Sequence, residues 1–421
     1  MQTSLELNKV QGHNQVMKLN SPSDWCEEEL GKAVKKKIRY GIVQTGENLE
    51  EGVPCLRVID LEYGIIDKSK LIKTSVKISQ QYRDCILEVG DIVFALRGEI
   101  GKVILIDENL AGINITRGVA RISAKSEIDS NYLYYQLQSP SVKSKIALQV
   151  NGTSLKEIPI NGLKKVVISS PKFLQEQRAI AAILSTWDKG IEKLQQLITA
   201  KQKRKKSLMQ QLLTGKKRFK EFTSEWQEVK YGDILKKVSR PVIWDDEELF
   251  NLISVRRRSG GLFHRESLYG YQILTKSLFT AKAGDFLISK MQILHGASGL
   301  TTEEFDGMKI SGSYISVVAK NPEQLDMEFF SWLSKLPYFY HQTYIASCGV
   351  HIEKMTFDFK TFLKLSTHLP STEEQRKIVN VLNASDKEIE TLQQKLSALK
   401  QQKKGLMQKL LTGQVRVKRK L

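Results

Sequence analysis

The chain has little of what secreted, membrane-embedded or disulfide-linked proteins need. Its 421 residues contain only four cysteines (Cys26, Cys55, Cys85 and Cys348), and their scattered positions predict reduced thiols rather than a disulfide framework or a zinc site. Apolar runs fall far short of the roughly 18 residues that a membrane span requires. The first residues, MQTSLELNKV, lack the basic and apolar regions of a secretory signal. These absences favour a cytoplasmic protein with no membrane partner.

Acidic residues are also in short supply. The 46 Asp and Glu are outnumbered by 65 Lys and Arg, which gives a net charge of +19. Because a Lys or Arg set against a phosphate releases condensed counterions, nucleic acid is the leading partner. A merely basic solvated surface and, more weakly, an anionic membrane surface remain as alternatives. The basic residues gather at four places: Lys201–Lys206, Lys216–Lys220, Arg256–Arg258 and Arg416–Lys420.

Motifs for catalysis are missing as well. There is no Asn/Asp-Pro-Pro-aromatic loop of an amine methyltransferase and no G-x-x-x-x-G-K-[ST] loop for ATP, while Gly98–Lys102 lacks phosphate-binding spacing and predicts a strand turn. The six histidines show no ligand spacing. Asp358-Phe359-Lys360, with Asp326 upstream, has the acidic-x-lysine form of a nuclease site, but such triplets are common by chance. We therefore predict no catalytic residue and no metal site.

What the chain does have is an internal repeat. The segment EQRAIAAILSTWDKGIEKLQQLITAKQKRKKSLMQQLLTG, from Glu176, aligns without a gap to EQRKIVNVLNASDKEIETLQQKLSALKQQKKGLMQKLLTG, from Glu374, over about 40 positions with roughly 22 identities. Fainter matches precede each copy, among them Gly90-Asp91 with Gly284-Asp285. The chain is therefore a divergent domain, a nearly constant segment, a second divergent domain and the constant segment again.

Each constant segment has the heptad spacing of a coiled coil. Ser371-Thr372 with Glu374 predicts a helix start, and Gly215 and Gly413 predict the helix ends. A helix of some 38 residues is roughly 57 Å long. Two such helices should pack on each other, although two independent helices, each lying on its own domain, are the alternative. The main seam positions are Ile180, Leu184, Ile191, Leu194, Ile378, Leu382, Ile389, Leu392 and Leu396.

Lysines also occupy core positions in the distal turns of both helices, Lys201 and Lys205 in the first copy and Lys403 in the second. A charged residue at such a position weakens a coiled-coil seam. We interpret this part of the seam as a candidate place for partner chains to join.

Each divergent domain mixes strand and helix signals, which predicts the α+β class. Helical stretches are expected near Ser130–Gln138 and Met327–Lys335. The expected strands, which alternate with Gly-bearing turns, are Leu56–Leu61, Asp91–Leu96, Lys102–Asp107 and Tyr314–Ala319.

Candidate DNA-binding residues lie in turns of both domains. Arg256-Arg257-Arg258 before Ser259-Gly260-Gly261 suits phosphates or guanine edges, with a solvated charge run as an equal alternative. Gln and Asn could read adenine. The candidates are Arg97, Asn114, Thr116, Arg117, Arg256, Arg257, Arg258, Lys290, Gln292 and His295.

Tandem copies of an E-Q-R opening, a heptad helix and an L-M-Q-x-L-L-T-G ending resemble the specificity subunit of Type I restriction-modification systems. The resemblance covers essentially the whole chain, with Cys348-Gly349 in place of the Asn151-Gly152 pairing of the first domain. It implies two globular mixed α/β target recognition domains, separated by the family's two conserved helices as an antiparallel coiled coil with a pseudo-two-fold internal repeat. The implied bounds are 1–20 for an N-terminal extension, 21–171 for the first domain, 172–215 for the first helix, 216–370 for the second domain, and 371–421 for the second helix and a basic tail.

The resemblance also implies the partners. Each domain would read one half of a bipartite target in double-stranded DNA, and rod length would set the half-site spacing. Two methyltransferase subunits would carry S-adenosylmethionine, and two motor-nuclease subunits would carry the ATP and Mg²⁺ chemistry, so this non-catalytic chain would hold no cofactor. Alternatives are a single-chain DNA-modifying enzyme or a nuclease of a related restriction system, and a coiled-coil linker or RNA binder.

Overall fold

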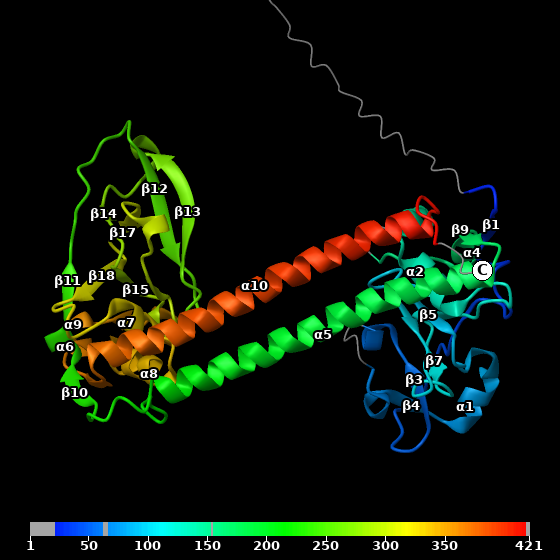
Figure 1. Ribbon diagram of the computed structural model, residues 1–421, viewed down its shortest axis with the longest axis horizontal. Coiled ribbons are helices and arrows are strands. Elements are labelled where there is room, and N and C mark those ends of the chain that lie inside the picture. Colours follow the sequence, from blue (N-terminus) through cyan, green and yellow to red (C-terminus); the bar gives the residue numbers. More distant parts are fainter. Residues whose placement is uncertain (1–21, 62–65, 153–154, 418–421) are drawn as a thin grey trace, which may run out of the picture. The chain divides into compact units, whose positions relative to one another are not determined.

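Two long helices are the main elements of the computed structural model, which describes residues 22–61, 66–152 and 155–417. Helix α5 covers Leu174–Leu212 and α10 covers Thr372–Leu411, 39 and 40 residues (Figure 1). Gly215 and Gly413 follow them with φ of 68° and 74°, the left-handed conformation that ends a helix and that glycine adopts without strain. The predicted residues 1–20 lie outside the described part. No helix in the described part is long and apolar enough to cross a membrane.

The chain divides into two units, residues 1–195 with 395–421 and residues 196–394. Each unit holds one divergent domain and a part of each long helix. In the first unit Asp188 of α5 pairs with Lys403 of α10, and in the second Lys201 of α5 pairs with Glu388 of α10. Higher numbers on one helix meet lower numbers on the other, so the two helices pack antiparallel, as the family resemblance implies.

The described residues of the first unit form three sheets and four short helices besides the long ones. Strands β1 (Trp25–Glu29) and β9 (Val167–Pro171) form an antiparallel pair. The four-stranded sheet has the order β2-β8-β5-β6 (Arg39–Tyr40, Val119–Ile122, Ile92–Ala95, Val103–Leu105), and the three-stranded sheet has the order β4-β3-β7 (Ile72–Thr74, Val53–Leu56, Asn114–Ile115). The helices are α1 (Val76–Gln81), α2 (Ser130–Gln138), α3 (Pro140–Ala147) and α4 (Ile160–Lys164).

The second unit repeats this plan. Strands β10 (Gln227–Lys230) and β21 (Ser366–Leu369) pair like β1 and β9. One four-stranded sheet is β11-β18-β15-β16 (Leu235–Val238, Tyr314–Ala319, Phe286–Ser289, Ser298–Leu300), the other is β13-β12-β17-β14 (Leu262–Tyr269, Leu249–Val255, Lys309–Ser311, Leu278–Thr280), and β19 (Ser347–Cys348) pairs with β20 (Thr356–Phe357). The helices are α6 (Tyr231–Ile234), α7 (Met327–Leu333), α8 (Pro337–Ile345) and α9 (Phe359–Phe362).

The two units share connectivity as well as composition. The sheet β2-β8-β5-β6 corresponds to β11-β18-β15-β16, with antiparallel neighbours throughout. In the other sheet one parallel pair, β3 with β7 or β12 with β17, lies beside one antiparallel hairpin. This confirms the predicted α+β class and pseudo-two-fold repeat.

One predicted strand is wrong. Leu56–Leu61 leaves β3 after Leu56, and Val58–Leu61 forms a 3₁₀ turn. The cause is Asp60, whose carboxylate accepts hydrogen bonds from the backbone N–H and the guanidinium of Arg57. The alternation of apolar residues did not show this local bond, which closes the turn.

Candidate functional site

Three of the four candidate residues of the first unit lie in two neighbouring turns. Arg97 follows β5 and is exposed, while Thr116 and Arg117 lie between β7 and β8. The Arg97 guanidinium lies against Gly118, where a Cβ would come within 2.9 Å of its Nε. Arg97 and Arg117 are therefore exposed cations on neighbouring turns.

The prediction that Asn114 contacts DNA is corrected by its burial. Its side chain is fully buried, its amide lies 3.3 Å from both the carbonyl and the Oγ of Ser79, and its Oδ1 accepts from the N–H of Ile115. All of its polar atoms are used inside the domain, so Asn114 holds β7 against α1 and does not reach a base.

In the second unit Arg256–Arg258 form the turn between β12 and β13. The Arg256 guanidinium donates to the carbonyl of Leu262 at 2.9 Å and stacks on Phe263 at 4.5 Å, so it holds the hairpin closed. Arg257 is exposed, with Glu353 at 3.9 Å. Arg258 is exposed and has a φ of 58°, a conformation that non-glycine residues rarely adopt. Arg257 and Arg258 are therefore the exposed cations of this turn that do not close the hairpin.

Of the other three candidates in the second unit, only His295 lies beside Arg257 and Arg258. His295 lines a cavity of about 350 Å³ with Arg257 and Arg258, and its Nε2 lies 3.2 Å from a Glu353 carboxylate oxygen. Lys290 turns inward, with its ammonium 2.6 Å from the carbonyl of Gly312. Gln292 is half-buried, and its Oε1 has no hydrogen-bond partner among the described residues.

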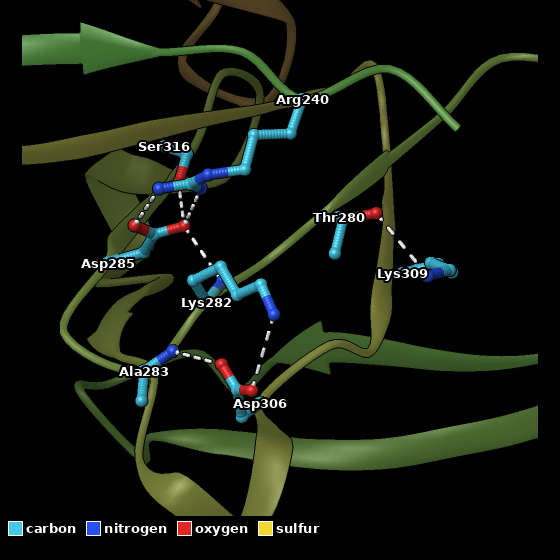
Figure 2. Close-up of polar contacts among 8 residues, drawn as sticks. All are labelled: Arg240, Thr280, Lys282, Ala283, Asp285, Asp306, Lys309 and Ser316. Atoms are coloured by element: carbon cyan, nitrogen blue, oxygen red, sulfur yellow. Dashed lines mark hydrogen bonds and ion pairs between the residues drawn. The ribbon is translucent and has the colours of Figure 1, made fainter. Parts of the chain in front are cut away.

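The Gly-Asp motif of the second domain is structural. Figure 2 shows Arg240 and Ser316 converging on Asp285, whose carboxylate lies 2.6 and 3.1 Å from the Arg240 guanidinium and accepts from Ser316 Oγ at 2.8 Å. The backbone N–H of Lys282 donates to the same carboxylate at 3.0 Å. These bonds satisfy a side chain that is only 1% exposed and fix the turn that leads into β15.

Asp91 does the same work in the first domain. Its carboxylate accepts from the backbone N–H of Glu88 at 2.8 Å and from the hydroxyl of Ser123. In both domains the aspartate thus accepts a hydrogen bond from the backbone N–H three residues before it. The pairing with an arginine, Arg240, is described only for the aspartate of the second domain.

The nuclease-like triplet has a structural explanation. Asp358 caps the N-terminus of α9, and hydrogen bonds from Thr361 and from the backbone of Lys360 keep the pKa of its carboxyl below the usual value. Asp326 caps α7 in the same way. In the described residues no group of three or more His, Cys, Asp or Glu is placed to hold a metal ion.

The sequence reasoning missed the residues that join each domain to the helices. The glutamine of each E-Q-R opening is buried: Gln177 accepts from the backbone N–H of Asp129 at 2.8 Å and donates to the carbonyls of Glu127 and Pro171 at 3.0 and 2.8 Å. Gln375 makes the same three bonds at 2.9 to 3.0 Å in the second unit. The exact repetition of E-Q-R was the available signal.

The adjacent glutamates pair with arginines that follow the other helix. Arg416, beyond the end of α10, forms a two-pronged pair with Glu176 at 2.7 and 2.9 Å and also contacts Asp24. Arg218, beyond the end of α5, does the same with Glu374 at 3.0 and 2.7 Å. Both glutamates are 1% exposed. The arginines of two basic clusters therefore stabilise the fold. The G-x-x-R spacing after each helix is the sequence pattern that could have predicted these pairs.

A lysine of α10 ties the first domain to both helices. Lys403 pairs with Asp188 at 2.5 Å and lies 5.4 Å from the ring centre of Tyr135. The Tyr135 hydroxyl donates to the same aspartate at 2.8 Å.

The second unit has the matching arrangement. Lys205 pairs with Asp386 and lies 4.9 Å from the ring centre of Trp332, whose indole N–H donates to Asn383. The core lysines therefore have internal partners. Our interpretation of them as a weakened seam left for partner chains is corrected.

The predicted seam residues differ in burial. Those near the ends of the helices pack against a domain as well as the other helix: Ile180 and Leu184 join Met407 and Leu410 in one core. Ile191, Leu194 and Ile389 are also buried, while Leu392 and Leu396 are half-buried. Ile378 and Leu382 are buried in the core of the second unit.

Two copies of one α+β domain, each tied to a part of both antiparallel helices through matching contacts, define a tandem-repeat protein. The family model described as "Type I restriction modification DNA specificity domain" matches residues 22–202 and 223–401. The chain belongs to this family, and the predicted resemblance is confirmed.

Individual relatives agree. The chain is 27% identical to the Type I restriction enzyme EcoBI specificity subunit of Escherichia coli, over 50% of this chain and 44% of that protein. It is 24% identical to the MjaVIII specificity subunit of Methanocaldococcus jannaschii over 98% of each. In fold it is similar to the S subunit from M. genitalium (TM-score 0.54, 18% identity, 94% of this chain and 98% of that one) and to the HsdS subunit from Thermoanaerobacter tengcongensis (TM-score 0.51, 17% identity, 94% and 98%).

Proposed function

We propose that this chain is the DNA-recognition subunit of a Type I restriction-modification complex and that each domain reads one half of a bipartite target. The observation that carries the proposal is the contrast between a repeated framework and unlike surfaces. The framework residues Gln177 and Gln375 make the same bonds, while the exposed arginines lie in turns that do not correspond between the two domains. A protein that reads two different half-sites needs this combination.

The exposed turns carry cations suited to DNA. The first domain offers Arg97 and Arg117, and the second offers Arg257 and Arg258. Arginine is the side chain best suited to two-pronged contacts with guanine or phosphate. Asn114, Arg256 and Lys290 are used internally, which narrows the base-reading candidates.

The chain supplies recognition and scaffolding, and the chemistry belongs to its partners. We assign S-adenosylmethionine to two methyltransferase subunits, and ATP and Mg²⁺ to two motor-nuclease subunits. Helices of 39 and 40 residues are each about 60 Å long at 1.5 Å per residue. We infer that this length sets the spacing of the half-sites.

The test is a binding and protection assay. The chain co-purified with its methyltransferase subunit should bind one split sequence at least about a thousandfold more tightly than unrelated DNA, and should direct S-adenosylmethionine-dependent methylation there. Cleavage of DNA by the purified chain with Mg²⁺ alone would instead support the single-chain nuclease alternative.

A further inference from the structure

The second unit contains a cavity that the base-reading proposal does not use. It has a volume of about 650 Å³ and lies between α5, α10, the α7–α8 corner and the β12–β13 turn. Its charged lining consists of four cations and two carboxylates, a balance of +2, contributed by Lys205, Lys206, Arg258, Lys335, Asp386 and Glu390.

The cations outnumber their internal partners. Lys205 is paired with Asp386, so this pair adds no net charge. Within the part of the chain that the structure describes, Lys206, Arg258 and Lys335 form no ion pair. Glu390 is the one remaining carboxylate of the lining, and it is 3.6 Å from Lys387 on the exposed side of α10.

Lys335 is the most unusual of these cations. Its ammonium lies 3.7 Å from the ring centre of Trp332, on which Lys205 also stacks. Burial, with the nearby charge of Lys205, lowers the pKa of the Lys335 ammonium below its ordinary value. Keeping this ammonium charged in a partly buried position costs free energy, and an anionic ligand in the open cavity would offset that cost.

The repeat shows that Lys335 is not needed to build the junction. Counting from the capping aspartates Asp129 and Asp326, the equivalent residue of the first domain is Gln138, which bonds to a carbonyl of its own helix. Because the first unit keeps its lysine, aspartate and aromatic contacts with a glutamine there, Lys335 serves something beyond the fold.

Arg258 is held over the same cavity by strained backbone. Arg258 and Ser259 both have positive φ, 58° and 53°. The arrangement is fixed by a bond from the Arg258 N–H to the carbonyl of His295 at 2.6 Å and by a 2.6 Å contact between the hydroxyls of Ser259 and Tyr340. Strain of this kind persists where the surroundings enforce it and marks functional positions.

We propose that this cavity is a phosphate-binding site and that the phosphate comes from the backbone of bound DNA. The inference rests on the proposed function. DNA is favoured as the source because the smaller cavity lined by Arg257, Arg258 and His295 shares Arg258 and Tyr340 with this one, so the basic lining continues to the exposed β12–β13 turn. Repeated phosphates match a continuous basic track.

The test compares Lys335→Gln and Arg258→Asn with Lys395→Gln, in the complex with the methyltransferase subunit. Glutamine is the residue of the sister domain, and asparagine tolerates positive φ. Lys395→Gln makes the same charge change at an exposed position of α10 outside the cavity lining. Each cavity variant should weaken binding to target and unrelated duplexes alike, by about 3- to 10-fold at low salt. Each should also reduce the slope of log K against log salt by about 0.9, or about 3.5-fold in affinity for a fourfold rise in salt.

Two results would overturn this site. A slope that changes no more than in Lys395→Gln would mean that no phosphate binds there, and an affinity loss confined to one base pair would make Arg258 a base reader. Inorganic phosphate is the second probe: saturation at micromolar concentration with an unchanged DNA slope would assign the cavity to a free anion. If the unaltered complex shows no sequence preference at all, the proposed function itself fails, which the variants alone would not reveal.

Discussion

Single buried polar residues set the attachment of each domain to the helices. Gln177 and Gln375 are 1% and 0% exposed, and each satisfies three backbone groups. A buried donor or acceptor left without its partner costs about 1–3 kcal/mol. These two positions therefore matter more for stability than the many exposed glutamines of the same helices.

We expect Gln375→Ala to lower the free energy of unfolding of the second unit by about 2–4 kcal/mol, because it leaves backbone groups at Asp326 and Gln324 unpaired. Urea unfolding followed by circular dichroism measures the change. Gln401→Ala, on the exposed surface of α10, is the matched control and should change stability by less than about 0.5 kcal/mol. Equal effects of the two substitutions would contradict the assigned role.

Replacing Lys335 should raise stability near neutral pH, whereas replacing Gln375 should lower it. The lowered pKa of Lys335 means that the charged ammonium is less favourable in the folded chain than in the unfolded chain. The penalty is complete at pH values below the folded pKa and disappears as pH rises through the ordinary value of 10.5. Lys335→Gln should therefore melt above the unaltered chain near neutral pH, and this advantage should shrink by about pH 10. Thermal melts at both pH values test this. An advantage that grows with pH would contradict the assignment.

At the scale of elements, the antiparallel helices and the two domains are joined by the same lysine, aspartate and aromatic contacts in each unit. Both pairs are partly exposed, with side-chain exposures of 14% and 42% for Lys403 and Asp188 and 25% and 45% for Lys205 and Asp386. Solvent weakens such pairs, so each is worth about 0.5–1 kcal/mol.

A double-mutant cycle tests this contribution. Lys205→Met and Asp386→Asn, alone and together, should give a coupling energy of about 0.5–1 kcal/mol in chemical unfolding. Lys403→Met with Asp188→Asn is an internal replicate in the first unit and should couple similarly. Additive effects in both cycles would show that these two ion pairs do not stabilise the packing of the helices.

The sequence was most informative where a pattern repeats along one element. Heptad spacing, the E-Q-R opening and the closing glycines predicted α5 and α10, because all of their signals are local. Leu56–Leu61 was misread because one aspartate bond outweighs alternation, and Asn114 because burial depends on α1 packing beside β7. The cavity at Lys335 brings together four separate segments, which no single-sequence pattern reveals.

At the scale of the whole molecule, the central claim is that two copies of one domain read two different half-sites. Residues 22–202 and 223–401 belong to one family of DNA specificity domains, yet their exposed arginines lie in turns that do not correspond. The base sequence of each half-site should then be set by its own domain, and the rest of the chain should not affect which bases are read.

The most direct measurement is a map of methylated adenines by single-molecule sequencing, in cells that carry this chain with its methyltransferase. We predict a split motif with methyladenine in both half-sites and a fixed gap between them. Exchanging residues 21–171 for the corresponding domain of another family member should replace one half-site and leave the other half-site and the gap unchanged. A continuous motif, or an exchange that alters both half-sites, would contradict the account.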